Sequence, residues 1–139
     1  MIKSVVTGGA GFIGSHLVDR LVELNHDVVV IDNLTTGRLS NLTQSINKIK
    51  FIHEDINCNL KNFIDFNNVD FVFHLAALAD IVPSIQNPDK YFKANVQGTF
   101  NILNSLNPSK LTKFIYAASS SCYGIPDEYP TREDAPIKP

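Results

Sequence analysis

Residues 7–14 have the sequence TGGAGFIG, and this stretch decides the predicted fold through the segments that it joins. Before it, Lys3–Thr7 (KSVVT) has the β-branched, apolar composition of a strand. After it, Phe12–Leu24 repeats apolar residues at the spacing of a helix. The residues expected on one side of that helix are Ile13, Leu17, Leu21 and Leu24. The stretch therefore predicts a tight turn from a strand into a helix.

Three glycines of this turn, Gly8, Gly11 and Gly14, stand at three-residue spacing. Glycine permits a tight turn and lets the backbone approach a ligand closely. The free N–H groups and the dipole of a helix N-terminus favour an anion such as a pyrophosphate. A turn from strand to helix can also use glycine for purely structural reasons. The strand, the helix and an acidic residue downstream together favour dinucleotide binding.

That acidic residue is Asp32, eighteen residues after Gly14 and directly after a second predicted strand, Asp27–Ile31. A carboxylate there accepts hydrogen bonds from the ribose hydroxyls of the cofactor and repels a 2′-phosphate, which favours NAD over NADP. The structural alternative is that Asp32 only caps the following turn. Arg38 complicates the assignment, because an arginine near this site can accommodate the extra phosphate.

The rest of the chain continues the alternation of strands and helices. Further strands are expected at Ile49–His53, Asp70–His74 and Lys113–Ala118. A long helix precedes the last strand, with Pro88 in its first turn. The buried stripe of that helix is expected to contain Phe92, Val96, Thr99, Leu103 and Leu106. Right-handed crossovers then predict an α/β fold with a doubly wound parallel sheet, the Rossmann fold, in strand order 3-2-1-4-5.

The length of 139 residues and the hydrophobic content of 44% suit one domain with a core. Residues 1–123 are expected to form an NAD-binding Rossmann domain. Residues 124–139 contain four prolines and little apolar periodicity, and they predict a loop. We expect the chain to be truncated before the later strands and the substrate domain of a longer protein.

The composition limits the classes of partner. The formal net charge is -2, without a run of like charges, which indicates neither nucleic acid nor a membrane surface as partner. No apolar stretch approaches the ~20 residues of a membrane span, and we expect a cytoplasmic protein. Cys58 and Cys122 stand far apart, and the four histidines lack paired ligand spacing. Neither a disulfide nor a metal site is therefore expected.

Six motifs follow one another along the chain. They are TGGAGFIG at 7–14, DNLTTG at 32–37, DI at 55–56, HLAA at 74–77, NVQGTFNIL at 95–103 and SSSCYG at 119–124. Their order and spacing resemble those of the NAD-dependent epimerase/dehydratase family, within the extended short-chain dehydrogenases/reductases. Inside that family, the chain is most similar to UDP-glucose 4-epimerases and UDP-N-acetylglucosamine 4-epimerases. The resemblance extends over all 139 residues.

This resemblance implies which residues contact an NAD cofactor. The glycine turn and the start of its helix would meet the pyrophosphate, the DNLTTG motif the adenosine ribose, and the DI pair the adenine. The HLAA motif would form the floor beneath the nicotinamide half, with Asn95 buried behind it. The implied cofactor-binding residues are Gly8, Gly11, Phe12, Ile13, Gly14, Asp32, Asn33, Thr35, Thr36, Gly37, Asp55, Ile56, Leu75, Ala76, Ala77 and Asn95.

For the substrate, the resemblance implies a catalytic role for Ser119. Relatives have a serine or threonine at this position, four residues before the tyrosine of the Tyr-Gly pair, and it hydrogen-bonds the sugar hydroxyl that is oxidised. Ser84 and Ser120 would contact the UDP-sugar. Without the surrounding motifs, the serines at 119–121 would indicate only a polar strand end.

Two departures from the family pattern narrow the activity. UDP-glucose 4-epimerases commonly have a lysine where Ala79 stands, and its absence, together with VPSI at 82–85, resembles the UDP-N-acetylhexosamine branch. Sugar 4,6-dehydratases have an Asp-Glu pair directly after the catalytic serine or threonine. Ser120 and Ser121 replace that pair here and are unsuited to proton transfer near neutral pH, so dehydration is disfavoured.

A third departure concerns the general base. In the family this base is the tyrosine of a Tyr-x-x-x-Lys motif, whose phenol pKa is lowered from ~10 by the neighbouring positive charges. None of the four tyrosines here has a lysine four residues later. These tyrosines are Tyr91, Tyr116, Tyr123 and Tyr129.

Together the motifs predict the NAD-binding portion of a nucleotide-sugar 4-epimerase, which passes a hydride reversibly between sugar C4 and NAD⁺ through a 4-keto sugar. By resemblance, the full-length form would bind a UDP-sugar and form a homodimer through a four-helix bundle that includes the long helix. The alternative, from another class of protein, is an NAD-binding module that catalyses nothing, or a degenerate remnant of the enzyme.

Overall fold

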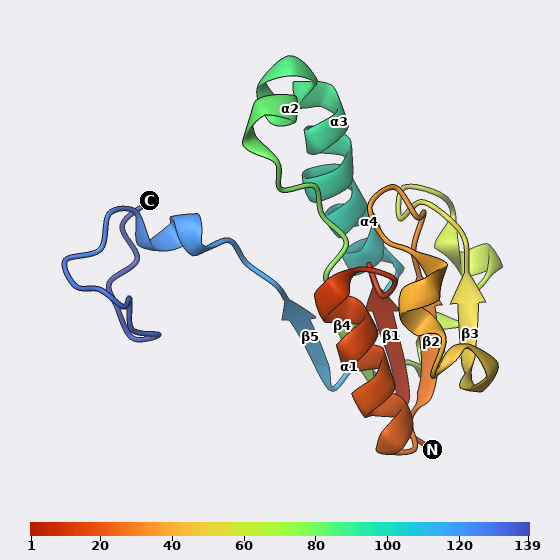
Figure 1. The fold of residues 1–139 in the computed structure, drawn as a ribbon. Helices are drawn as coiled ribbons and strands as arrows, with labels where there is room; N and C mark the ends of the chain where they lie inside the picture. The colour runs from red at the N-terminus through yellow and green to blue at the C-terminus, as the bar shows by residue number, and fades with distance from the viewer.

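The computed structural model describes residues 1–139, and its centre is one five-stranded parallel sheet in the order β3-β2-β1-β4-β5. The predicted Rossmann topology is therefore confirmed (Figure 1). The strands are β1 (Lys3–Thr7), β2 (Asp27–Ile31), β3 (Ile49–Ile52), β4 (Phe71–His74) and β5 (Lys113–Tyr116). The α-helices are α1 (Phe12–Glu23), α2 (Ile81–Gln86), α3 (Pro88–Phe92) and α4 (Gly98–Ser105). Between α3 and α4 the chain forms a π-helical turn, Lys93–Gln97.

The central strand β1 pairs in parallel with β2 on one side and with β4 on the other. Alternate residues of each strand point to opposite faces of the sheet, so both faces contribute to a core. One core lies under α4 and the loop that follows β3, and it contains Val5, Val29, Ile31, Ile52, Ile56, Leu60, Ile64, Phe66, Val69, Val72 and Ile102. The other lies under α1 and contains Val6, Ala10, Val18, Leu21, Val28, Val30 and Leu42.

The buried side of α1 differs from the predicted one. Ser15, Val18 and Leu21 are buried, whereas Ile13 and Leu24 are exposed. The reason is that the first turn of α1 packs against the glycine turn through its smallest residues, which rotates the apolar residue Ile13 away from the sheet. Apolar spacing alone therefore predicted the helix correctly and two members of its buried face wrongly.

The long helix also buries a different side from the predicted one. Pro88 begins α3 as expected, and α3, the π-helical turn and α4 follow one another without a break. However, Phe92, Val96 and Leu103 are exposed, and Ile102 is the large apolar residue in the core. Figure 1 shows the reason for the first two: α2 and α3 project beyond the end of the sheet, and only α4 lies against it.

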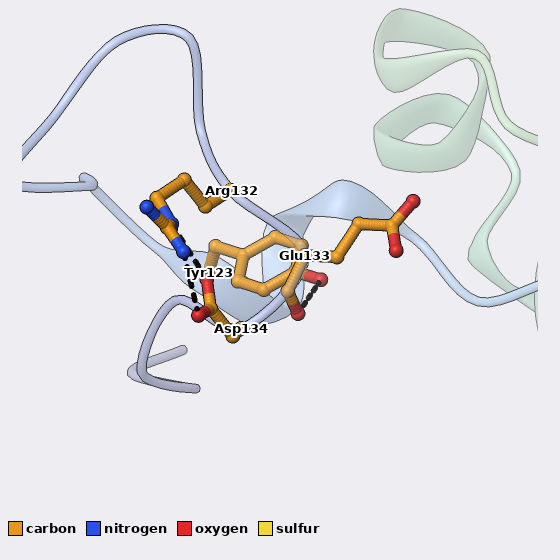
Figure 2. A network of polar contacts seen from close by, with 4 residues as sticks. All are labelled: Tyr123, Arg132, Glu133 and Asp134. Carbon is orange, nitrogen blue, oxygen red and sulfur yellow. Dashed lines mark hydrogen bonds and ion pairs between the residues drawn. The ribbon is translucent and has the colours of Figure 1, made fainter.

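The last segment of the chain, drawn in blue in Figure 1, leads away from the sheet after the edge strand β5. A short 3₁₀ turn, Ser120–Tyr123, is its one helical element. Figure 2 shows how this segment folds on itself: the hydroxyl of Tyr123 donates to the carbonyl of Glu133 at 3.3 Å, and Arg132 forms a bidentate ion pair with Asp134. That ion pair lowers the pKa of Asp134.

Candidate functional site: a cleft at the carboxyl edge of the sheet

A cleft of about 670 Å³ lies at the carboxyl ends of β1, β2, β3 and β4, where open α/β sheets bind ligands. Its volume is in the range of small-molecule sites. The predicted cofactor residues that line it are Gly8, Gly11, Asp32, Asn33, Thr35, Thr36, Gly37, Asp55, Ile56, Leu75, Ala76 and Ala77. The remaining residues of the lining, which the sequence motifs did not predict, are Ile31, Glu54, Asn57, Leu78, Lys90, Lys93, Ala94 and Gln97.

The missed residues are of two kinds. Glu54 and Asn57, for example, flank predicted motif residues in the chain. The others of interest are Lys90, Lys93 and Gln97, whose spacing of three and four residues places them on one side of the helical segment after Pro88. This spacing was visible in the sequence, but nothing there indicated that this side of the helix would face the cleft.

The glycine turn depends on close approaches that no side chain would permit. Gly8 has a φ of +71°, and a Cβ there would lie 2.7 Å from the backbone nitrogen of Ala76. A Cβ at Gly14 would lie 2.2 Å from the carbonyl oxygen of Gly8. The turn after β1 thus packs backbone to backbone against the turn after β4 and against its own helix.

The start of α1 presents free backbone donors at this turn. The N–H of Gly11 donates to Gly8 at 3.2 Å, and the helical ladder resumes with the N–H of Ser15 donating to Gly11 at 3.0 Å. The amides of residues 12–14 between them are the orphan donors of the helix N-terminus. No side chain caps α1, and no acidic residue stands in its first turn. This arrangement suits an anionic ligand such as a pyrophosphate.

Asp32 links the glycine turn to the loop after β2. One carboxylate oxygen accepts from the N–H of Ala10 at 2.9 Å, and the other accepts from the N–H of Leu34 at 2.8 Å. Asp32 therefore does cap the turn that follows it, as the structural alternative predicted. Because each carboxylate oxygen has a further lone pair, these bonds leave acceptor sites for ribose hydroxyls.

A second carboxylate, Asp55, lies at the end of the cleft next to β3. It accepts from the side chain of Asn33 at 2.9 Å and from the backbone and side chain of Asn57 at 2.9 and 2.8 Å. Partial burial acts to raise the pKa of Asp55, but these N–H donors outweigh it and lower that pKa below its ordinary value. Asp55 is therefore an anionic acceptor that joins the loops after β2 and β3.

His74 lies beneath the floor of the cleft, 1% exposed, in a chain of polar contacts. Its Nδ1 lies 2.7 Å from the Thr7 hydroxyl and its Nε2 lies 2.9 Å from the Thr99 hydroxyl. The Thr99 hydroxyl donates to the carbonyl of Asn95, so the histidine Nε2 must be the donor to Thr99. Burial lowers the pKa of His74 to about 4, and the ring is neutral at neutral pH.

Asn95 stands behind the floor of the cleft and does not line it. Its Oδ1 accepts from the N–H of Leu78 at 2.8 Å, and its Nδ2 donates to the carbonyl of Leu78 at the same distance. The Asn95 side chain thus pairs with both backbone groups of Leu78, as a neighbouring strand would. Together with His74, it connects the glycine turn, the floor and the long helix.

Several predicted residues lie outside the cleft lining. Phe12 and Ile13 are exposed at the start of α1, and Gly14 packs beneath the glycine turn. Ser84 belongs to α2, where its hydroxyl donates to Ile81. Ser119 is exposed on the segment after β5, and its hydroxyl oxygen accepts from the backbone N–H of Ser121 at 3.2 Å. Ser120, the next residue, is exposed as well.

The model of the NAD dependent epimerase/dehydratase family matches residues 4–139. The chain belongs to this family. It is 42% identical over 137 residues to a putative UDP-glucose 4-epimerase of Methanocaldococcus jannaschii, covering 97% of this chain and 44% of that protein. The chain thus spans about 44% of the length of that curated relative.

Solved epimerase structures have the same arrangement of elements. One is UDP-N-acetylglucosamine 4-epimerase from Methanobrevibacter ruminantium M1 in complex with UDP-N-acetylmuramic acid, with a TM-score of 0.81, 34% identity, and coverage of 99% of this chain and 44% of that one. Another is UDP-glucose-4-epimerase from Stenotrophomonas maltophila with bound NAD and formylated UDP-arabinopyranose. Its TM-score is 0.85, with 28% identity and coverage of 99% of this chain and 43% of that one.

The cleft of this family member fits the NAD for which the family is named. The glycine turn leaves a cradle that a Cβ would fill, the start of α1 offers unpaired amides, and the carboxylate of Asp32 lines the cleft with acceptor sites left for hydroxyl donors. No helix of the structure is both long and apolar enough to cross a membrane. No group of three or more metal-ligating side chains is assembled in it.

Cofactor choice is expected to depend on Asp32. Asp32→Ala should weaken NAD binding by about 1.5–3 kcal/mol, the usual range for hydrogen bonds to a charged group, and should reduce the preference over NADP. Calorimetry with both cofactors measures this, with unfolding monitored in parallel because Asp32 also holds Ala10 and Leu34. Asp27→Ala, at the far end of β2, is the matched control. Equal NAD affinity in the Asp32 variant, or tighter NADP binding by the wild type, contradicts the assignment.

Acid stability is expected to depend on His74. The pKa of its ring falls from 6.5 in the unfolded chain to about 4 in the folded one, so between these values the unfolded chain binds the extra proton. The free energy of unfolding should therefore decrease by up to about 1.4 kcal/mol per pH unit as the pH falls from 6.5 toward 4, and this group should have no effect above that window. Urea unfolding across this pH range measures the slope.

His74→Gln keeps a donor and an acceptor but does not titrate, so it should remove this slope. His53→Gln changes an exposed ring and should retain it. A wild-type slope that persists in His74→Gln assigns the acid sensitivity to other groups and contradicts the neutral, buried His74.

Proposed function

We propose that this chain is the NAD-binding portion of a nucleotide-sugar 4-epimerase. The observation that supports this best is the cleft itself, where the glycine turn, the free amides of α1 and Asp32 lie together at the carboxyl edge of the sheet. When bound, NAD would accept a hydride from sugar C4 and return it to the other face of the 4-keto sugar.

Different residues of the chain would hold different parts of the cofactor. The amides at the start of α1 would bind the pyrophosphate, and Asp32 would orient the adenosine ribose. The floor residues Leu75, Ala76 and Ala77 are apolar and would exclude water beneath the nicotinamide half. His74 lies below that floor and holds it in position without contacting the reacting atoms.

No tyrosine that could act as the general base of the proposed reaction lines the cleft. Tyr123 donates its hydroxyl to the carbonyl of Glu133, and Lys138 pairs with Asp127 in the same segment. No Tyr-x-x-x-Lys motif is present in these 139 residues. We therefore propose that the base and most of the sugar site belong to the part of the enzyme that corresponds to the remaining length of its relatives.

The proposed substrate is a UDP-sugar, and Ala79 and the sequence VPSI at 82–85 favour a UDP-N-acetylhexosamine. Ser119 would hydrogen-bond the 4-hydroxyl of the sugar, and Ser84 and Ser120 would contact the same substrate. The second candidate function is an NAD-binding module without catalysis. The observation that favours it is that these 139 residues contain no Tyr-x-x-x-Lys motif and that no tyrosine lines the cleft.

We also propose that the long helix forms a homodimer interface. Phe92, Val96, Phe100 and Leu103 follow one another at spacings of three and four residues, with 59%, 53%, 66% and 47% of their surfaces exposed. They form one apolar stripe on the side of the helix away from the sheet. A continuous stripe of this kind marks an interaction site, and a second copy of the same helix is complementary to it in length and chemistry.

The catalytic proposal is tested with purified protein saturated with NAD. The 139-residue chain should not convert UDP-galactose or UDP-N-acetylglucosamine, as followed by NMR of the sugars, because general-base catalysis alone contributes ~10²–10⁴ in rate. A form that continues into a Tyr-x-x-x-Lys segment should convert at least one of them. In that form, Ser119→Ala should lower kcat and leave bound NAD unchanged, with Ser121→Ala as the control.

Conversion by the 139-residue chain alone contradicts the proposal that its catalytic base lies elsewhere. If the form with the Tyr-x-x-x-Lys segment binds NAD but converts neither sugar, the binding module is the better description. If Ser121→Ala damages turnover more than Ser119→Ala does, the assignment of the sugar-binding serine is wrong.

The dimer is tested by sedimentation velocity of the chain. The wild type should sediment as a dimer, and Phe100→Glu should shift it to the monomer, because the glutamate places a charge in the middle of the apolar stripe. Ile125→Glu is the matched control, since it charges a residue that is 90% exposed in the last segment. A wild type that is monomeric at high micromolar concentration contradicts the interface.

A further inference from the structure

The loop after β3 forms one wall of the cleft, and the long helix holds it from behind. The side chain of Asn101 in α4 donates to the carbonyl of Ile56 at 2.5 Å and to the carbonyl of Cys58 at 2.8 Å. In the other direction, the side chain of Asn57 donates to the carbonyl of Lys93 at 3.1 Å. Hydrogen bonds to the helix thus fix three consecutive residues of this loop.

Gly98 makes the closest approach between the two segments. A Cβ at this position would lie 2.4 Å from Cδ1 and 2.6 Å from Cγ1 of Ile56, well inside van der Waals contact. Ile56 is 7% exposed, belongs to the core with Ile102, and also lines the cleft. Any side chain at position 98 must therefore displace the side chain of Ile56, which has little free space because it is buried in the core.

The π-helical turn brings the same helix to the cleft. Lys93 and Gln97 at its two ends, and Ala94 between them, line the cleft beside the loop after β3. The carbonyl of Lys93 accepts both the N–H of Gly98, across the wide turn, and the side chain of Asn57. Turns of this kind are short and frequently lie at functional sites.

We propose that Gly98 and Asn101 are positioning residues for the adenine end of the cofactor. They do not contact the ligand: Gly98 sets how closely the helix approaches Ile56, and Asn101 fixes the loop carbonyls on either side of Asn57. These contacts set the position of the cleft wall that the loop after β3 and the π-helical turn form together. This inference rests on the proposed function, in that the cleft must bind an adenine nucleotide.

The test uses two small probes, AMP for the adenosine end and inorganic pyrophosphate for the glycine turn, with affinities measured by NMR titration of the full chain. Gly98→Ala should weaken AMP binding by about tenfold or more and change pyrophosphate affinity by less than about twofold. Replacing a glycine inside a helix with alanine ordinarily stabilises the helix, so helix propensity does not explain such a loss. Asn101→Ala should also weaken AMP binding several-fold, whereas Asn104→Ala, on the exposed side of α4, should not.

A rescue separates positioning from general damage. The double variant Gly98→Ala/Ile56→Ala removes both side-chain atoms that the new Cβ would meet, and it should recover AMP affinity to within about threefold of Ile56→Ala alone. Unchanged AMP binding in Gly98→Ala and in Asn101→Ala overturns the inference, as does an equal loss for AMP and pyrophosphate. If Gly98→Ala does not fold, Asn101→Ala against Asn104→Ala decides the question. A wild type that binds neither AMP nor NAD overturns the proposed function, and this inference with it.

Discussion

The backbone contact between the turn after β1 and the turn after β4 is the constraint on which the site depends. Gly8 lies so close to the backbone of Ala76 that a Cβ would overlap it, and its positive φ directs the chain into α1. This contact places the free amides of the helix N-terminus beside the floor of the cleft. A substitution at Gly8 would both strain the backbone and separate the free amides of α1 from that floor.

Hydrogen bonds between polar side chains also hold the elements around the cleft in place. Thr7, His74 and Thr99 form one buried sequence of hydrogen bonds from β1 through β4 to the long helix, and Asn95 extends it to the segment behind the floor. No buried side-chain polar atom in the structure lacks a partner. A fully satisfied network of this kind specifies a single arrangement of the elements that it joins. The neutral state of His74 belongs to that arrangement, because the ring has no anionic partner.

The long helix serves different purposes along its length. In α4, Ile102 enters the core and Asn101 holds the loop after β3. In the π-helical turn, Lys93 and Gln97 face the cleft. Phe92, Val96, Phe100 and Leu103 are exposed instead, and they form the stripe that we propose as a dimer interface. A single helix can meet these demands because its first part extends beyond the sheet to the cleft and Gly98 lets its second part approach Ile56 closely.

The topology of this protein could be predicted from sequence because its signals are local. The β-branched strands, the glycine turn at 7–14 and the acidic residue after β2 are all defined within short windows, and together with right-handed crossovers they favour the dinucleotide-binding strand order 3-2-1-4-5. The sequence motifs likewise located most of the cleft lining, since the carboxyl ends of parallel strands meet at one edge of the sheet.

Only the tertiary structure decided which side of each helix is buried. Apolar spacing predicted Ile13, Phe92 and Val96 inside, yet α1 buries Gly14, Ser15, Val18 and Leu21, and α4 buries Gly98 and Ile102. Helix α3 extends beyond the sheet. The wall of the cleft formed by the π-helical turn and the loop after β3 was not predicted either. It results from contacts between residues about 40 positions apart, such as Asn101 with Ile56 and Cys58. Local sequence patterns contain no information on such distances, because backbone packing sets them only when the sheet has formed.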